Sequence, residues 1–201
     1  MKSIFISIIV FSFSINSYCQ TSREYLERGI AKDSLQDYRG AIVEYNKAIE
    51  LNPKYEDAYN NRGIAKFYLQ DYRGAIADYN KLIQINPNIA TAYRNRALAK
   101  RKLQDNRGAI ADYNKSIVID PNNADSYNGR GLAKADLHDY RGAIQDYSKS
   151  IEIDSTSAKA YNNRGLAKIK LGQKNSGCLD LSKAGELGAE KAYEAIKELC
   201  N

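Results

Sequence analysis

The segment Asp71-Tyr72-Arg73-Gly74-Ala75-Ile76 decides how this chain folds, because close copies of it occur at a fixed interval. The other copies run from Asp37 to Ile42, from Asp105 to Ile110 and from Asp139 to Ile144, each starting 34 residues after the one before. Self-similarity with a period of this length is the signature of a repeat protein. The sequence therefore predicts five repeats, at residues 22–55, 56–89, 90–123, 124–157 and 158–191, the last of them degenerate.

Each repeat is predicted to form two helices. In the second repeat, Asp57 to Leu69 carries apolar residues close to helical spacing. Asp71 is suited to cap the next helix, since its carboxylate can accept the unpaired amide hydrogens of the first turn. That helix is expected over Tyr72 to Ile85, because the proline of Asn86-Pro87 disfavours a helical residue before it. Such helices cannot bury their apolar stripes alone, so the fold class is predicted to be all-α, built from stacked pairs.

The pattern resembles the tetratricopeptide repeat over Ser22 to about Lys191, with Ser22 taken as position 1. The family's small residue at position 8 is Gly29, Gly63, Ala97, Gly131 and Gly165. Its alanine at position 20 is Ala41, Ala75, Ala109 and Ala143, with Gly177 in the fifth repeat. Its aromatic at position 24 is Tyr45, Tyr79, Tyr113 and Tyr147, with Leu181 in the fifth repeat. The resemblance implies a right-handed superhelical solenoid of five helix-turn-helix repeats that presents a concave groove.

Eight of the 13 glycines occupy two phases of the repeat. The first phase holds Gly29, Gly63, Gly131 and Gly165, and the second holds Gly40, Gly74, Gly108 and Gly142. Glycine inside a helix costs up to about 1 kcal/mol relative to alanine. Both phases are therefore interpreted as packing glycines, where two backbones approach closely.

The sequence departs from the family pattern at position 7, where arginine replaces the usual leucine. These arginines are Arg28, Arg62, Arg96, Arg130 and Arg164, each followed four residues later by lysine. The second helix offers an acid in every repeat: Glu44, Asp78, Asp112, Asp146 and Asp180. A buried unpaired charge costs several kcal/mol, so five internal bridges are predicted in preference to a solvated ridge of charge. The rings of Tyr79 and its equivalents are expected to stack on the guanidinium groups.

The first 19 residues have the pattern of a secretory signal peptide. Lys2 precedes an apolar stretch from Ile4 to Ile15, which is short of the roughly 20 residues of a membrane span. Ser17 and Cys19 supply small residues for cleavage before Gln20. The protein is thus expected to be exported, periplasmic or secreted, with no membrane span in the mature chain. An uncleaved anchor and a lipoprotein anchor at Cys19 stay open as less favoured alternatives.

The composition argues against several classes of function. One histidine, three cysteines and no tryptophan leave little material for a zinc cluster or a histidine-based catalytic centre, and we expect neither a metal nor a cofactor. His138 occupies a phase held by glutamine in earlier repeats and is interpreted as a surface turn residue. No loop is long enough for a covered active site, so we expect no enzyme. A net charge of +6, from 30 basic and 24 acidic residues, disfavours nucleic-acid binding.

The resemblance also implies which residues line the groove, since the family uses first-helix positions 2, 5, 6, 9, 12 and 13. Asparagine offers both a donor and an acceptor, so asparagines at positions 5 and 6 can hold the backbone of an extended peptide. That they only reflect recent duplication stays open. Position 9 is Ile or Leu instead of the asparagine of the family's dicarboxylate clamp, so that clamp is expected to be absent. The predicted groove residues are Asn60, Asn61, Ile64, Phe67, Tyr68, Arg94, Asn95, Leu98, Arg101, Lys102, Asn128 and Asn162.

Binding is predicted to centre on the second and third repeats, with a protein or peptide of acidic and apolar character as partner. Arg94 and Arg101 are seven residues apart, so both should project from one helix face. Phe67 and Tyr68 would cover apolar area beside them. Packing of the two aromatics against a neighbouring repeat stays open, as does a different function, an envelope module that binds carbohydrate or peptidoglycan.

A capping helix tied by a disulfide is predicted at the C-terminus, over residues 189–200. Gly188 allows the chain to reverse, and Glu190 to Leu199 has Ala192, Tyr193, Ile196 and Leu199 on one face. Cys178 lies 10 residues before this turn and Cys200 lies 12 after it, so an antiparallel hairpin brings the two sulfurs to similar height. An oxidising compartment would favour the bond, although two unpaired thiols remain the alternative.

Overall fold

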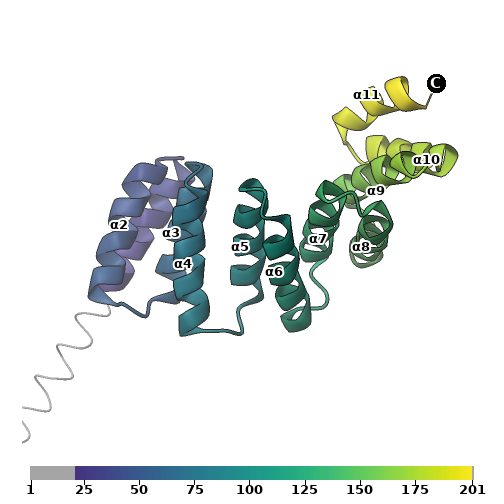
Figure 1. The fold of residues 1–201 in the computed structure, drawn as a ribbon. Coiled ribbons are helices and arrows are strands. Elements are labelled where there is room, and N and C mark those ends of the chain that lie inside the picture. Colours follow the sequence, from purple (N-terminus) through teal and green to yellow (C-terminus); the bar gives the residue numbers. More distant parts are fainter. Residues whose placement is uncertain (1–20, 201) are drawn as a thin grey trace, which may run out of the picture. The chain divides into compact units, whose positions relative to one another are not determined.

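The computed structural model describes residues 21–200, and within this range the chain forms only helices (Figure 1). The predicted signal peptide, with Cys19, lies outside the described residues. Residues 21–34 are helical. The helices that follow are α2 (Tyr38–Leu51), α3 (Glu56–Tyr68), α4 (Tyr72–Ile85), α5 (Ala90–Lys102), α6 (Asn106–Ile119), α7 (Ala124–Asp136), α8 (Tyr140–Ile153), α9 (Ala158–Lys170), α10 (Lys174–Glu186) and α11 (Glu190–Leu199).

The chain divides into two compact units between Asn88 and Ile89. The described part of the first unit, residues 21–88, contains the helix at 21–34 with α2, and α3 with α4. The second unit, residues 89–200, contains the pairs α5–α6, α7–α8 and α9–α10, and α11 packs against α10. We number these pairs first to fifth along the chain. The predicted all-α fold of paired helices followed by a C-terminal helix is confirmed.

An aspartate caps the second helix of each of the first four pairs. The carboxylates of Asp37, Asp71, Asp105 and Asp139 accept a hydrogen bond from the backbone N–H three residues on, at 2.9 to 3.0 Å. The residue that donates this bond is always a glycine, and a Cβ there would collide with the capping carboxylate. The interpretation of Gly40 and its equivalents as packing glycines was therefore wrong, because they serve the cap.

The other glycine phase does mark close packing between the two helices of a pair. A Cβ at Gly63 would lie 2.7 Å from the ring of Tyr79, and one at Gly131 would lie 2.6 Å from the ring of Tyr147. Tyr79 and Tyr147 are each 1% exposed. The glycine thus makes room for a large buried ring.

The turn between the two helices of each pair contains a residue in the left-handed region. Gln36, Gln70, Gln104 and His138 have φ between 60° and 64°, and Gly172 has φ of 79° at the same phase in the fifth pair. His138 is exposed in this turn, as predicted, and its Nδ1 lies 3.0 Å from the hydroxyl of Tyr140.

Buried ion pairs join the two helices within the second to fifth pairs, as predicted. Nε and Nη2 of Arg130 both donate to the carboxylate of Asp146, and Lys134 contacts the same carboxylate at 2.8 Å. The side chain of Asp146 is 4% exposed. Equivalent trios are Arg62, Lys66 and Asp78; Arg96, Lys100 and Asp112; and Arg164, Lys168 and Asp180.

The first pair differs, and so does the aromatic partner of the arginines. Glu44 pairs with Lys32 at 3.0 Å, while Arg28 lies over the ring of Tyr25, so the predicted Arg28–Glu44 bridge was wrong. The guanidinium of Arg62 likewise lies over the ring of Tyr59, 5.4 Å from its centroid. The expectation that Tyr79 and its equivalents provide this ring was wrong. The tyrosine three residues before each arginine lies on the same face of the same helix, so its ring is the one that the guanidinium contacts.

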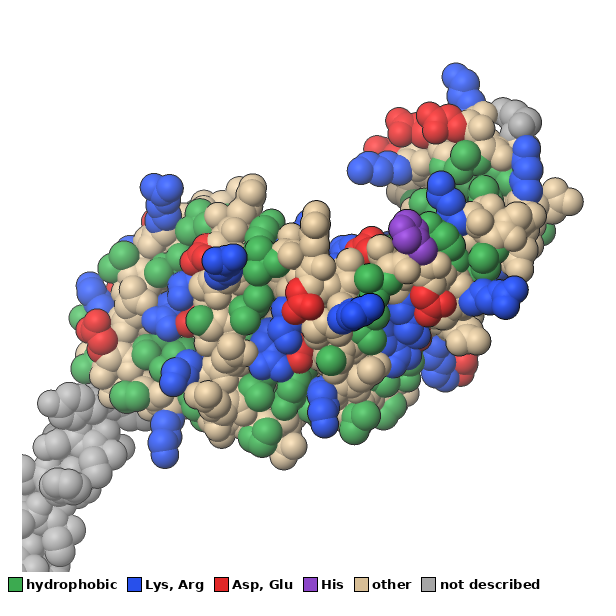
Figure 2. All heavy atoms as spheres, viewed as in Figure 1, with side chains coloured by type: hydrophobic (Ala, Val, Ile, Leu, Met, Phe, Trp, Pro, Cys, Tyr) green, Lys and Arg blue, Asp and Glu red, His purple; other side chains and the backbone are tan. Residues whose placement is uncertain are grey.

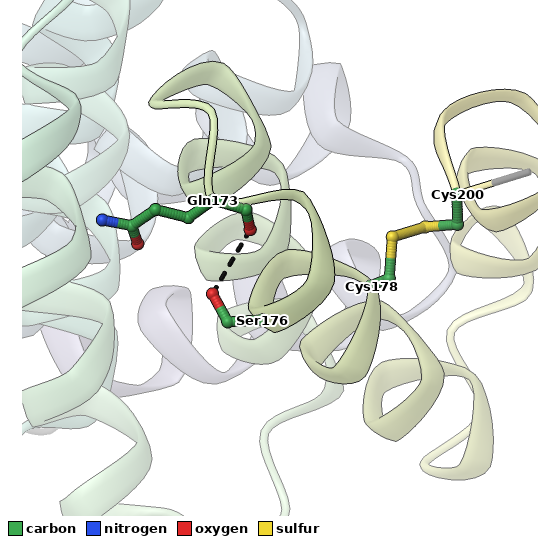
Figure 3. Close-up of a disulfide and its surroundings, with 4 residues drawn as sticks. All are labelled: Gln173, Ser176, Cys178 and Cys200. Atoms are coloured by element: carbon green, nitrogen blue, oxygen red, sulfur yellow. Dashed lines mark hydrogen bonds between the residues drawn. A yellow bond between two sulfur atoms is a disulfide. The ribbon is translucent and has the colours of Figure 1, made fainter.

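The C-terminal helix is joined to α10 by a disulfide between Cys178 and Cys200, whose Cα atoms are 5.9 Å apart (Figure 3). The predicted disulfide is thus confirmed, and Cys178 is half-buried. Ala192 is fully buried, but Tyr193 and Leu199 are 59% and 38% exposed, so the predicted apolar face of α11 is covered only in part. Among the described helices, α11 packs chiefly against the neighbouring helix α10.

Candidate functional site

The predicted groove residues of the first unit all lie on α3. Asn60 donates a hydrogen bond to Oδ1 of Asn61 at 3.2 Å, and Ile64 is half-buried four residues on. Tyr68 is 60% exposed, but its ring stacks on that of Tyr38, with centroids 5.0 Å apart. The two aromatic residues at the end of α3 therefore take part in packing within this unit.

Phe67 is engaged in the same cluster. Its ring meets the edge of Tyr72 on α4, with centroids 5.2 Å apart, and that of Tyr68 at 6.2 Å. Such edge-on and stacked pairs contribute about 0.5 to 1.5 kcal/mol beyond area burial. Phe67 and Tyr68 therefore pack against other aromatic rings, as the alternative interpretation of these two residues expected.

In the second unit, four predicted groove residues line one cavity of about 290 Å³. These are Arg94, Asn95 and Leu98 on α5, and Asn128 on α7. We call this cavity, with its walls, the second-unit groove. Its remaining wall residues are Tyr113, Asp125, Gly129, Leu132 and Lys159.

The other predicted residues of this unit lie elsewhere. Arg101 and Lys102 are at the end of α5, and Lys102 is exposed. Asn162 on α9 lines a second, more open cavity of about 470 Å³ with residues of the turn before α11. The structure thus brings together a third of the predicted set, and it adds Tyr113, Asp125, Gly129, Leu132 and Lys159, which the sequence reasoning did not include.

Both predicted arginines of the groove have carboxylate partners on α7. Arg94 lies 3.5 Å from Asp125, and Arg101 lies 3.1 Å from Asp136. Lys159 of α9 contacts Asp125 as well, at 2.5 Å. These pairs cross from one helix pair to the next. The sequence pattern does not predict them, because they depend on how the first helices of neighbouring pairs stack.

The asparagines of α7 and α9 are also linked across pairs. Nδ2 of Asn163 donates to Oδ1 of Asn128 at 3.0 Å, and Asn128 is only 7% exposed. Part of the predicted asparagine row is therefore used to hold neighbouring first helices in register, and each amide so engaged has fewer groups left for a ligand.

Tyr113 forms a wall of the groove because its ring is placed differently from the other buried tyrosines. In the third pair, position 8 is Ala97, whose Cβ occupies the space that Gly63 and Gly131 leave for Tyr79 and Tyr147. The ring of Tyr113 instead lies against Gly129 of the next pair, where a Cβ would collide with it. Gly129 replaces an asparagine found at the same phase in Asn61, Asn95 and Asn163.

Burial raises the pKa of Tyr113 to about 12, although the nearby Arg101 and Arg94 oppose the shift. The phenol is therefore neutral at physiological pH and presents a hydroxyl that can donate or accept a hydrogen bond. Tyr45 has a partner for its hydroxyl in Asp33, at 2.6 Å. Tyr45 and Tyr113 thus occupy equivalent positions in the repeat, but the hydroxyl of Tyr45 bonds to Asp33 whereas Tyr113 lines the second-unit groove.

Within residues 21–200, His, Cys, Asp and Glu side chains form no group of three or more with the arrangement of a metal site. None of the helices in the same range is both long and apolar enough to cross a membrane. On the face drawn in Figure 2, basic and acidic side chains are interspersed. The second-unit groove combines the apolar side chains of Leu98 and Leu132 with the charged groups of Arg94, Asp125 and Lys159, which pair with one another.

Comparison with known families agrees with this architecture. A TPR repeat model matches residues 34–69, 99–137 and 135–172, which together make up more than half of the chain. A second tetratricopeptide repeat model matches residues 56–89. The chain belongs to the tetratricopeptide repeat family. No curated protein matches it in sequence at the level of a relative.

Solved tetratricopeptide structures resemble this one closely. A crystal structure of the MamA protein is 25% identical, with a TM-score of 0.75 over 87% of this chain and 95% of that one. YrrB, described as a TPR protein with an unusual peptide-binding site, is 18% identical, with a TM-score of 0.72 over 93% and 97% of the two chains. The first TPR of Spaghetti (RPAP3), bound to the HSP90 peptide SRMEEVD, is 27% identical, with a TM-score of 0.58 over 59% of this chain and 94% of that one.

Proposed function

We propose that this tetratricopeptide chain is a non-enzymatic scaffold that binds an extended segment of a partner protein in the second-unit groove. The observation that carries the proposal is the cavity itself, in which half-buried Leu98 and Leu132 offer apolar area between polar groups of α5, α7 and α9. A concave site with apolar walls and a few polar groups is typical of ligand recognition. The RPAP3 repeat, which resembles this chain and holds a peptide, supports the same kind of ligand.

The partner segment is proposed to carry acidic and apolar residues. Arg94 and Lys159 share the single carboxylate of Asp125, so the rim of the groove has one positive charge in excess. Asp125 and Lys159 are 51% and 60% exposed in their side chains, and surface pairs of this kind contribute at most about 1 kcal/mol. A carboxylate of the partner can therefore compete for either cation without a large loss.

We also propose that the protein is exported, to the periplasm or to the outside of the cell. The N-terminal pattern of Lys2, an apolar stretch and small residues before Gln20 supports processing by a signal peptidase. The disulfide between Cys178 and Cys200 supports an oxidising compartment, because such bonds are rare in the reducing cytosol. Mass spectrometry of the native protein should find Gln20 as the first residue, and an N-terminus that retains residues 1–19 would contradict cleavage.

Site-specific photocrosslinking tests the scaffold function. A photoreactive amino acid at Leu98 should capture a protein partner from the native compartment, because this side chain lines the groove. The matched control is Val118 on α6, which is 77% exposed and does not line it. Capture from Val118 but not from Leu98 would contradict the groove. Retention of the chain by purified cell wall, with no captured protein, would favour the envelope module instead.

A further inference from the structure

Two departures from the repeat pattern act on Tyr113, a tyrosine that lines the second-unit groove. Ala97 stands where the other four pairs have glycine, and Gly129 stands where the second, third and fifth pairs have asparagine. In the fourth pair, the ring of Tyr147 lies beside Gly131. In the third pair, the Cβ of Ala97 blocks the equivalent position for Tyr113, whose ring lies against Gly129 instead. The two departures are therefore coupled through Tyr113.

We propose that Ala97, Tyr113 and Gly129 make the groove a specificity pocket that receives one apolar side chain of the bound segment. This inference rests on the proposed function and adds the class of residue that is read. An asparagine at position 129 would collide with the ring of Tyr113, which lies against Gly129. The two replacements together therefore let this ring form a wall of the cavity.

The residues that line the cavity determine which class of side chain it can receive. Leu98 and Leu132 line the cavity from neighbouring first helices, and the buried ring of Tyr113, 2% exposed, lines it as well. Arg94, Asp125 and Lys159, with their one positive charge in excess, are the only charged residues among those that line the cavity. A charged side chain inserted among Leu98, Leu132 and Tyr113 would lose its hydration without a charged partner beside it, whereas an apolar side chain gains by leaving water.

The size of the cavity fits this assignment. Its volume of about 290 Å³ lies at the lower end of the range for sites that hold a whole small-molecule ligand, about 300 to 1,000 Å³. One aliphatic or aromatic side chain of an extended segment suits such a space. The amides of Asn95 and Asn128 flank it and lie close to where the backbone of that segment would pass.

The fourth and fifth pairs provide an internal contrast. Tyr147 packs against Gly131 of its own pair, and the phase of Gly129 is occupied by Asn163, whose amide donates to Asn128. Restoring this arrangement in the third and fourth pairs requires two changes at once, Ala97→Gly and Gly129→Asn. Changing Gly129 alone would force the new side chain into the ring of Tyr113, because Ala97 still blocks the alternative position.

The test uses a phage-displayed library of random dodecapeptides, selected on the mature wild-type protein. Selected peptides should share one aliphatic or aromatic residue, and replacing it by alanine should weaken binding about tenfold or more. The A97G/G129N variant should bind the parent peptides at least tenfold more weakly and bind parent and alanine peptides alike. The control V118N adds the same amide at an exposed position of α6 and should leave both affinities unchanged.

The outcomes separate the pocket from the scaffold function. Equal binding of the selected peptides to wild type and A97G/G129N, with loss of binding in L98D, would overturn the pocket and leave the groove in place. Peptides whose binding is unaffected by L98D would refute the groove and the pocket together. If A97G/G129N does not fold, as judged by circular dichroism, A97G alone serves, since it lets Tyr113 turn back to its own pair. It should weaken the selected peptides more than the alanine-substituted ones, and equal affinities would again overturn the pocket.

Discussion

The fourth and fifth helix pairs join their helices by different means. In the fourth, Asp139 caps α8, and the ring of Tyr147 fills the space beside Gly131. In the fifth, the N-cap residue Gln173 makes no side-chain cap, and Leu181 stands in place of the tyrosine. A pair in the middle of a solenoid thus depends on its own polar cap and a buried ring, whereas the last pair has lost both.

The fifth pair compensates by close approach of its backbones and by a covalent link. A Cβ at Gly165 would lie 2.8 Å from the carbonyl oxygen of Gly177, and one at Gly177 would lie 2.7 Å from that of Gly165. The disulfide then holds α11 over α10. Both pairs keep the buried trio of arginine, lysine and aspartate.

The largest expected effect concerns this shared ion pair. Asp146→Ala and Asp180→Ala should each reduce the free energy of unfolding by about 3 kcal/mol or more, because each leaves an arginine and a lysine without their buried partner. Denaturant unfolding of both variants measures the loss. A large loss at one site with none at the other would show that only one of the pairs depends on its bridge.

The same aspartate predicts how stability changes with acid. Burial alone would raise the pKa of Asp180, but hydrogen bonds from Arg164 and Lys168 outweigh it and hold the pKa below its ordinary value. A carboxyl group with a lowered folded-state pKa stabilises the fold above about pH 4 and loses that contribution as pH falls further. Melting temperatures should therefore drop on acidification below pH 4, and less steeply for Asp180→Ala. An equally steep drop in that variant would contradict the assignment.

The disulfide is expected to act only on the end of the chain. Replacing Cys178 and Cys200 by serine should destabilise the docking of α11 by about 3 kcal/mol, since the bond closes a loop between residues 22 apart. Hydrogen exchange should become faster in α11 and remain as in wild type in α7 and α8. Uniform acceleration along the chain would show that the last helix stabilises the whole solenoid.

Exchanging the caps sharpens the contrast between the pairs. Asp139→Ala should cost about 1 kcal/mol, because the N–H of Gly142 loses its acceptor. In the fifth pair, Ser176 stands at the phase of Gly142 and donates its hydroxyl to the carbonyl of Gln173 (Figure 3). Gln173→Asp alone should therefore gain no stability, because the Cβ of Ser176 would collide with the new carboxylate, whereas Gln173→Asp combined with Ser176→Gly should gain up to about 1 kcal/mol. Thermal unfolding measures all three variants. No gain from the double variant would mean that the turn before α10 differs too much to accept the cap.

The smallest expected effect concerns two junctions between pairs. The hydroxyls of Ser116 and Ser126 lie 2.9 Å apart across the junction of the third and fourth pairs. At the next junction Ser150 replaces Ser116 and Ala160 replaces Ser126, and the hydroxyl of Ser150 is fully buried without a hydrogen-bond partner. Ala160→Ser should supply the missing partner and stabilise by about 1 kcal/mol. The matched variant Ser126→Ala should cost a similar amount. A loss of stability in Ala160→Ser would show that the junction has no room for the hydroxyl.

The 34-residue period predicted the helices, the aspartate caps and the ion pairs, because these depend on residues within one repeat. The groove was predicted less well. The pairing of Arg94 with Asp125 and of Arg101 with Asp136 crosses between repeats and depends on how neighbouring first helices stack. The displacement of Tyr113 could have been inferred from the sequence, since Ala97 breaks the glycine phase that accommodates the ring elsewhere.

The binding of a polypeptide in the second-unit groove is tested most directly by a crystal structure of the mature protein with one of the selected dodecapeptides. The peptide should lie along α5 and α7, with an apolar side chain in contact with Leu98, Leu132 and the ring of Tyr113. A peptide seated on α6 and α8, with the space in front of Tyr113 left empty, would contradict the account.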